Sequence, residues 1–223
     1  MDGVIIDSIE ECYSVSKDAY YESKSFIYSE DRYKKIFFKY RGHVRPPYEY
    51  FCLHDAIEHF YDKQFDDLQF INFFNNNSKK FQYDDKAAFE ETFFTIRLDH
   101  QNNDFDSWIK MNPLTSFGET LKSKNNANTY VITTKNMQAA KKILNFYKIG
   151  VDKIYSNDEV RDAGTKGKLI KEIMDASNES DAIFIDDSVE HLDTVDDDRV
   201  TCYFADWGYG KNTDYPTYSF VKC

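Results

Sequence analysis

The sequence has few of the residues that interrupt or cross-link a chain. Its 223 residues include 8 glycines, 4 prolines and 4 cysteines. The cysteines are widely scattered, and none belongs to a CxxC pair or has a histidine at the spacing of a zinc site: Cys12, Cys52, Cys202 and Cys223. We therefore expect reduced thiols, and a fold held by a buried core, which a chain of this length can form without disulfides or a structural metal.

The sequence also lacks long apolar runs and any excess of positive charge. No run approaches the roughly 18 to 20 apolar residues that span a bilayer, and the first residues are not a basic segment followed by a long apolar one. The 28 Lys and Arg residues are outnumbered by 39 Asp and Glu residues, which gives a net charge of -11. Such a chain repels nucleic-acid backbones and acidic membranes on average. We expect a soluble cytoplasmic protein that binds neither; its oligomeric state stays open.

Residues 9–111 are rich in aromatic and charged side chains and contain a single glycine, Gly42. Bulky apolar residues recur there at helical spacing, which places them on one face of a helix. Two such sets are Ile36, Phe37 and Tyr40, and Ile57, Phe60 and Tyr61. The pattern predicts a helical domain.

After residue 112 the pattern changes to short β-branched or aromatic runs that alternate with amphipathic stretches. This alternation is typical of a parallel sheet built from βαβ units. The predicted strands are 129–133, 153–156, 182–186 and 200–204, and the predicted helices are 114–124, 137–147, 165–177 and 189–195. We expect an α/β fold in which residues 1–8 and 112–223 form a Rossmann-like three-layer core with a parallel sheet, and residues 9–111 are an inserted helical cap.

Chemically active side chains follow the predicted strands, at the edge where an open parallel sheet binds its ligands. Thr133 and Thr134 offer hydroxyl and backbone N–H groups at a helix N-terminus, which suit a phosphate. Asp186 and Asp187 offer carboxylate oxygens, which suit Mg²⁺. Lys166, at the start of a helix, can bring a cation to the same edge. Each also has an ordinary interpretation, as a helix cap, a turn or a solvated surface residue.

In their order and spacing these segments resemble the motifs of the haloacid dehalogenase superfamily of phosphohydrolases, in the branch with a helical cap after the first motif, similar to phosphoglycolate phosphatase. The resemblance rests on residues 2–8 (DGVIIDS), 131–133 (VIT), 165–168 (TKGK), 183–187 (IFIDD) and 206–210 (DWGYG). It covers both ends of the chain and brackets a cap of the expected size.

The resemblance implies a Mg²⁺-dependent phosphatase that hydrolyses a small phosphorylated metabolite through an aspartyl-phosphate. In such enzymes a first aspartate attacks phosphorus, and an aspartate two residues later acts as acid and base. The implied catalytic residues are Asp2, Thr133 and Lys166, the implied substrate contact is Thr134, and the implied Mg²⁺ ligands are Asp2, Asp186 and Asp187. Lys168 is an alternative to Lys166, and the outer acidic position of the fourth motif falls near Glu190 or His191.

The chain departs from the family pattern at the first motif. No residue stands two positions before Asp2, where the nucleophile belongs, and the strand that carries it in the family is not represented. We expect the true start to lie upstream of Met1. In one alternative, Val4-Ile5-Ile6 takes the central strand position and brings Asp7 to its end. In another the chain is a non-catalytic binding protein of the same fold; a sugar phosphomutase is a further alternative for an active member.

The cap contains a compact basic cluster in an otherwise acidic chain. It consists of Arg41, His43 and Arg45, followed by two prolines. Arg41 and Arg45 are candidates for contact with an anionic substrate. The alternative is that they pair with neighbouring carboxylates on the cap surface.

Overall fold

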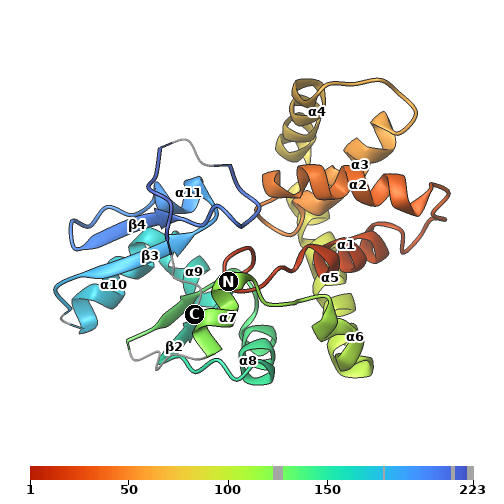
Figure 1. The fold of residues 1–223 in the computed structure, drawn as a ribbon. Coiled ribbons are helices and arrows are strands. Elements are labelled where there is room, and N and C mark those ends of the chain that lie inside the picture. Colours follow the sequence, from red (N-terminus) through yellow and green to blue (C-terminus); the bar gives the residue numbers. More distant parts are fainter. Residues whose placement is uncertain (123–127, 178, 212–213, 220–223) are drawn as a thin grey trace. The chain divides into compact units, whose positions relative to one another are not determined.

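The computed structural model describes residues 1–122, 128–177, 179–211 and 214–219. The chain divides into two compact units. Ile9–Met111 forms one, here called the helical unit, and Met1–Ser8 together with Asn112–Cys223 forms the other, here called the α/β unit; Figure 1 shows the elements of each. No helix in the described residues is long and apolar enough to cross a membrane.

The helical unit begins with α1 directly after the short first segment of the α/β unit. Its elements are α1 (Ile9–Tyr20), α2 (Glu30–Tyr40), a 3-10 turn (Arg41–His43), α3 (Glu49–Phe60), α4 (Asp67–Lys80), α5 (Tyr83–Asn103) and α6 (Phe105–Lys110). Local capping sets some of these boundaries. The Asp66 side chain accepts from Gln69 N at 2.8 Å, and the Gln69 side chain accepts from Asp66 N at 3.0 Å, which closes a capping box at the start of α4.

Aromatic rings fill the core of the helical unit. The two predicted apolar faces are confirmed: Phe37, Tyr40, Ile57 and Tyr61 are buried, and the remaining members of each set pack partly buried against them. Tyr40 stacks on Phe70 with ring centroids 3.8 Å apart. Rings at this density supply a large apolar area per residue, so the unit can form a core with little glycine and no cross-link.

A buried ion pair crosses the helical unit from α1 to α5. Arg97 Nε and Nη2 donate to the two carboxylate oxygens of Glu11 at 2.6 and 2.8 Å. Trp108 Nε1 donates to Glu11 Oε1 at 3.2 Å. Glu11 and Trp108 are fully buried, and Arg97 is 5% exposed. The charge of each partner is therefore matched inside the core by a bidentate contact.

His54 of α3 is a second polar group in this core. Its Nε2 lies 2.9 Å from Ser16 Oγ and its Nδ1 lies 2.9 Å from Tyr33 Oη. The ring is fully buried and stacks on Tyr20 and Tyr33. Burial lowers the pKa of His54 to about 3. The imidazole is therefore neutral at pH 7, and its one donor and one acceptor are both engaged.

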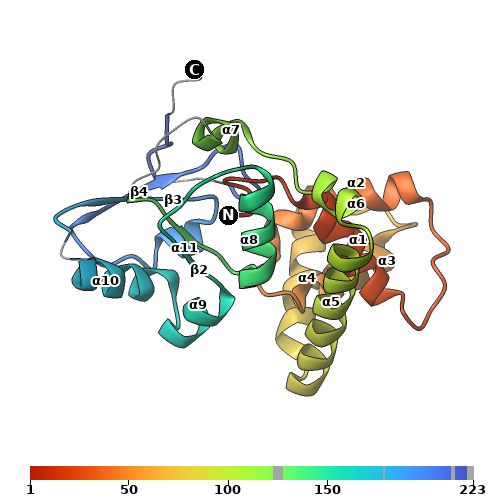
Figure 2. The same ribbon diagram turned by 90° about the horizontal axis from the view of Figure 1, so that it is seen from below.

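The α/β unit mixes helices with short parallel strands, so the predicted α/β class is confirmed at this level. Its elements are α7 (Ser116–Lys122), β1 (Tyr130–Ile132), α8 (Met137–Phe146), β2 (Lys153–Tyr155), α9 (Asn157–Ala163), α10 (Lys166–Ser177), β3 (Ala182–Asp186), α11 (Val189–Leu192) and β4 (Val200–Phe204). Figure 2 shows the strands from a second direction. The predicted strands and helices are found, with β1, β2 and α11 shorter than expected. Residues 123–124 of the helix predicted over 114–124 lie outside the described residues.

Helix α9 was not predicted. Its N-cap is Ser156, whose N–H and hydroxyl both donate to the Glu159 carboxylate, at 2.8 and 2.6 Å. Serine followed three residues later by glutamate is a capping-box signal. The local sequence therefore did contain the information that a helix starts here.

The strands pair as two separate two-stranded sheets in the described residues. β1 runs parallel to β2, with Val131 opposite Ile154, and β3 runs parallel to β4, with Phe184 opposite Cys202. Sequence analysis predicted one parallel sheet. The sheets differ from that prediction because no described strand joins β1 to β3.

The alternative in which Val4-Ile5-Ile6 forms a central strand is wrong. The N–H groups of all three residues donate to the carbonyl oxygen of Met1, at 3.3, 2.8 and 3.2 Å. Gly3 has a φ of 72°, which suits glycine and lets the chain turn back on itself. Residues 1–6 therefore form a tight turn, with only isolated bridges at its ends.

Candidate functional site

The turn at residues 1–6 is fixed by two later segments of the chain. Thr115 Oγ1 donates to Val4 O at 2.6 Å, and Thr115 N donates to Ile5 O at 3.0 Å, just before α7. Trp207 Nε1, in the loop after β4, also donates to Val4 O at 3.0 Å. Gly118 packs so closely that a Cβ there would lie 2.1 Å from Ile5 O. These contacts hold Asp2 in a defined place.

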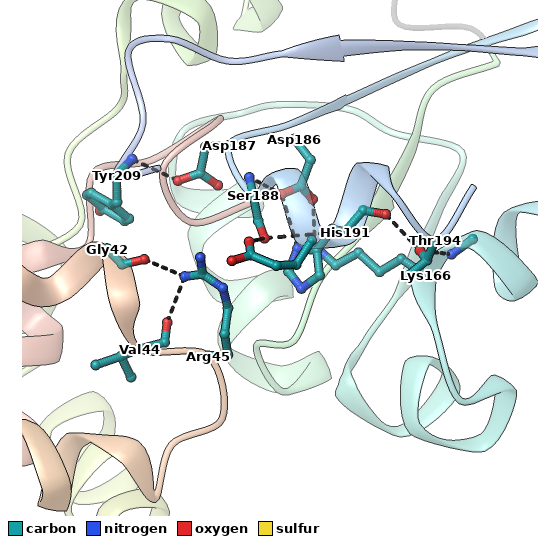
Figure 3. Close-up of polar contacts among 12 residues, drawn as sticks. Gly42, Val44, Arg45, Lys166, Asp186, Asp187, Ser188, His191, Thr194 and Tyr209 are labelled. Atoms are coloured by element: carbon teal, nitrogen blue, oxygen red, sulfur yellow. Dashed lines mark hydrogen bonds and ion pairs between the residues drawn. The ribbon is translucent and has the colours of Figure 1, made fainter. Parts of the chain in front are cut away.

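Asp186, at the carboxyl end of β3, has close polar contacts at both of its carboxylate oxygens (Figure 3). Its Oδ2 accepts from Lys166 Nζ at 2.8 Å, and its Oδ1 accepts from Ser188 N at 2.9 Å and contacts His191 Nδ1 at 3.1 Å. Asp186 and Lys166 are both almost fully buried. Burial alone raises the pKa of Asp186, but Lys166 and His191 outweigh it and hold that pKa well below its usual range.

Asp187 lies among three of the chain's glycines. Its Oδ2 accepts from Tyr209 N at 2.8 Å. A Cβ at Gly3 would lie 2.2 Å from Asp187 Oδ2, one at Gly208 would lie 2.3 Å from Asp187 Cβ, and one at Gly210 would lie 1.8 Å from Asp187 O. Burial, and the charge of Asp186, raise the pKa of Asp187. Backbone from both ends of the chain thus surrounds Asp187. A residue larger than glycine at any of these three positions would collide with it.

Asp2 pairs with a lysine that sequence analysis did not single out. Asp2 Oδ1 lies 3.3 Å from Lys135 Nζ, and the Lys135 side chain is 0% exposed. Lys135 N donates to Thr133 Oγ1 at 3.1 Å, and Thr133 is buried at the end of β1. A fully buried lysine is rare unless it is paired. The sequence signal that could have found it is its place directly after Thr133-Thr134.

Four charged side chains influence the same group, the amino group of Met1. The Met1 amino group is buried, and burial lowers its pKa. The charge of Lys166 lowers that pKa further, while the charges of Asp2, Asp186 and Asp187 raise it. Electrostatic influence of this kind requires proximity in a poorly solvated place. The contacts agree, because Gly3, next to Asp2, packs against Asp187, and Lys166 donates to Asp186. The structure therefore brings together Asp2, Lys166 and the aspartate pair.

Two candidate residues differ in exposure from their neighbours. Thr134 is exposed, whereas Thr133 and Lys135 on either side are buried. Lys168 is exposed, whereas Lys166 faces Asp186. Of the two lysines in the TKGK segment, Lys166 is thus the one placed at the site.

Arg41 and Arg45 lie in the helical unit, where each side chain donates to backbone carbonyls of its own loop. Arg41 Nη1 and Arg45 Nη1 each donate to Val44 O at 3.2 Å, and Arg45 also donates to Gly42 O (Figure 3). The Arg41 guanidinium lies over the Tyr50 ring, 5.1 Å from its centroid. Loop carbonyls therefore help to orient these two arginines, and their contact with an anionic substrate stays a prediction.

The donor set suits a hard cation that keeps part of its water shell. No group of three or more His, Cys, Asp or Glu side chains in the described residues could by itself hold a metal ion. Mg²⁺ commonly binds through one or two carboxylates and the phosphate oxygens of a substrate. Asp187 Oδ1 accepts no hydrogen bond from the described residues, while both oxygens of Asp186 are engaged. The residues present therefore fit Mg²⁺ bound together with a phosphate.

The chain matches no protein-family model. Comparisons with curated proteins and with solved structures also find no match. What the site does is argued below from its own geometry and charge.

Proposed function

We propose that the protein is a Mg²⁺-dependent phosphohydrolase of the haloacid dehalogenase type that acts on a small phosphorylated metabolite. The observation that carries the proposal is the convergence of Asp2, Lys166 and the Asp186-Asp187 pair at the carboxyl ends of the strands. Lys135 offsets Asp2 and Lys166 offsets Asp186, whereas no described lysine or arginine pairs with the half-buried carboxylate of Asp187. A divalent cation offsets such a charge and attracts a phosphate.

In this proposal Asp187 and Asp2 would hold Mg²⁺, while Asp186, which accepts from Lys166 Nζ and Ser188 N, would fix the position of Lys166. The ion would neutralise the phosphate oxygens. Lys166 contributes a second positive charge to the same phosphate, and Thr133 contributes its hydroxyl hydrogen, since its oxygen already accepts from Lys135 N.

Asp2 is the proposed acid and base. It protonates the leaving oxygen of the substrate and then takes a proton from the attacking water. The nucleophile of this mechanism is an aspartate two positions before Asp2, so turnover is expected from a chain extended on the amino side of Met1. The proposal includes a Rossmann-like three-layer core in which β1, β2, β3 and β4 belong to one sheet.

The test is phosphate release from a generic aryl phosphate, with and without Mg²⁺, by such an extended chain and by the present one. We expect Mg²⁺-dependent turnover from the extended chain alone. Asp2→Asn and Asp187→Ala should each reduce it to background. Lys166→Met should lose at least a hundredfold in kcat/KM, whereas Lys168→Met, two residues away and exposed, should stay within about twofold, because the lost charge there does not face the site. Equal turnover by Asp187→Ala and the parent would refute the assignment.

The same experiment separates two related functions. Mg²⁺ and phosphate binding by a folded, extended chain that shows no turnover would favour a binding protein that keeps the fold. Transfer of the phosphoryl group to a second sugar hydroxyl instead of to water would favour a sugar phosphomutase.

A further inference from the structure

Tyr209, in the loop that follows β4, makes hydrogen bonds to two separate segments of the α/β unit. Its backbone N–H donates to Asp187 Oδ2 at 2.8 Å (Figure 3). Its side-chain hydroxyl contacts the segment just before α1: the oxygen accepts from Ser8 N at 2.6 Å, and the hydroxyl donates to Asp7 Oδ1 at 2.8 Å. Tyr209 therefore connects Asp187 with residues 7–8.

The hydroxyl of Tyr209 acts both as a donor and as an acceptor. A phenol has one donor hydrogen and lone pairs that accept. Its hydrogen is donated to a carboxylate, which gives the stronger, charge-assisted kind of hydrogen bond. Ser8 is fully buried, and its N–H is satisfied by the phenol oxygen. Two hydrogen bonds thus hold this side chain at residues 7–8, and neither of them involves Asp187.

The loop that carries Tyr209 has little room to move relative to Asp187. A Cβ at Gly208 would lie 2.3 Å from Asp187 Cβ, and one at Gly210 would lie 1.8 Å from Asp187 O. Where the loop begins, Ala205 N donates to Asp186 O at 2.9 Å. A displacement of Tyr209 must therefore displace Asp187 as well, or break the hydrogen bond between them.

The hydrogen bond from Tyr209 N determines how the carboxylate of Asp187 is turned. Because Oδ2 is held by this N–H, Oδ1 is the oxygen that accepts no hydrogen bond from the described residues. The neighbours of a metal ligand orient it and thereby raise its affinity for the metal. We propose that Tyr209 is a positioning residue for Asp187: its hydroxyl anchors the loop to residues 7–8, and its N–H turns the carboxylate so that Oδ1 can bind the cation. The role toward the cation rests on the proposed function, whereas the anchoring of the loop does not.

Tyr209→Phe separates the two contacts of this residue. It removes the hydroxyl and keeps both the ring and the backbone N–H, so Asp187 loses no direct partner. Tyr215→Phe is the matched control. The Tyr215 hydroxyl also donates to an aspartate of the α/β unit, Asp193 Oδ1, at 2.8 Å. Each variant therefore loses a hydrogen bond from a phenol to a carboxylate in the same unit.

The first measurement is hydrogen exchange of the backbone amide of residue 209, without divalent cations. We expect this amide to exchange about tenfold faster in Tyr209→Phe than in the parent, because the loop has lost its hydrogen bond to a charged group. In Tyr215→Phe the rate should stay within about threefold of the parent. Equal exchange in Tyr209→Phe and the parent, or the same acceleration in the control, would overturn the anchoring.

The second measurement is a calorimetric titration with Mg²⁺ in the presence of inorganic phosphate. Tyr209→Phe should raise the Kd for Mg²⁺ by about tenfold, and Tyr215→Phe should leave it within about twofold of the parent. If Tyr209 only stabilises the unit, both variants unfold at a lower temperature and bind Mg²⁺ like the parent, and that result would overturn the positioning role. A parent that binds no Mg²⁺ would instead refute the proposed function, and the exchange of residue 209 would still decide whether the loop is anchored.

Discussion

The two units of this chain bury charge in opposite ways. In the helical unit, Glu11 is matched by Arg97 and completed by Trp108, and the ring of His54 is kept neutral. In the α/β unit, Lys166 and Lys135 each offset one carboxylate, and no described lysine or arginine pairs with Asp187. A buried cluster in which every charge has an opposite partner helps to fix a fold. A cluster with an unpaired charge lowers stability unless a ligand of opposite charge binds to it. Under the proposed function, the first unit is a scaffold and the second unit carries the ligand chemistry.

The largest loss of stability should come from removing one partner of the buried ion pair in the helical unit. Glu11→Ala leaves Arg97 buried without its carboxylate, and we expect a loss of about 3 to 5 kcal/mol in the free energy of unfolding. Native-state hydrogen exchange of helical-unit amides measures it. The control is Lys17→Met, which removes a more exposed pair with Glu30 and should cost at most about 1 kcal/mol. Similar losses in both variants would contradict the comparison.

A second test uses pH to charge the helical core. The pKa of His54 is about 3 in the folded protein and ordinarily 6.5, so below pH 6.5 the unfolded chain binds the proton more readily. Stability should therefore fall as pH drops, by about 2 to 3 kcal/mol between pH 6.5 and 4.5. Urea unfolding at several pH values measures this, and His54→Gln should remove that part of the slope. An unchanged slope in the variant would show that other groups cause the acid sensitivity.

The third test concerns how the α/β unit holds its turn. Gly118→Ala would place a methyl group against Ile5 O, a backbone atom that cannot move aside without displacing the turn. We expect a loss of about 1 to 3 kcal/mol, read from exchange of α/β-unit amides, with the helical unit unaffected. Gly150→Ala is the matched control, because a Cβ there meets nothing within 4 Å. Comparable losses in both would mean that the close contact is unimportant.

The smallest effect should have the opposite sign. Asp187→Asn keeps an oxygen for Tyr209 N and removes one of two adjacent carboxylate charges. Without divalent cations we expect the α/β unit to gain about 1 kcal/mol, since burial and Asp186 raise the pKa of Asp187 and so disfavour its charge. Calorimetric titration should at the same time show loss of Mg²⁺ binding. A destabilised variant would indicate that Asp187 is structural.

Much of the fold could be predicted because its signals are local. The strand runs at 182–186 and 200–204 and the apolar faces of α2 and α3 are set by periodicity within a few residues. The separation into two sheets could not be predicted, because it depends on whether residues 1–6 extend or turn. Gly3 and the contacts of Thr115 and Trp207 decide that question, and two of these three come from distant parts of the chain.

The candidate site shows the same division. Asp186, Asp187 and Lys166 could be proposed because each directly follows a strand or opens a helix. Lys135 was missed since its burial and its pairing with Asp2 depend on tertiary placement. The exposure of Lys168 beside the buried Lys166 follows from helix rotation relative to the sheet, which spacing alone does not supply.

Each unit contains one tryptophan, which serves as its intrinsic fluorescent probe. Of its two tryptophans, Trp108 is fully buried beside Glu11 in the helical unit, and Trp207 hydrogen-bonds Val4 O in the α/β unit. Replacing either tryptophan by phenylalanine leaves one tryptophan. The wavelength of its maximum emission then reports how far water reaches the indole ring in that unit. In a variant that keeps only Trp207, fluorescence reports changes in the turn beside Asp2. Ligand binding near that turn can therefore be titrated by fluorescence without an added dye.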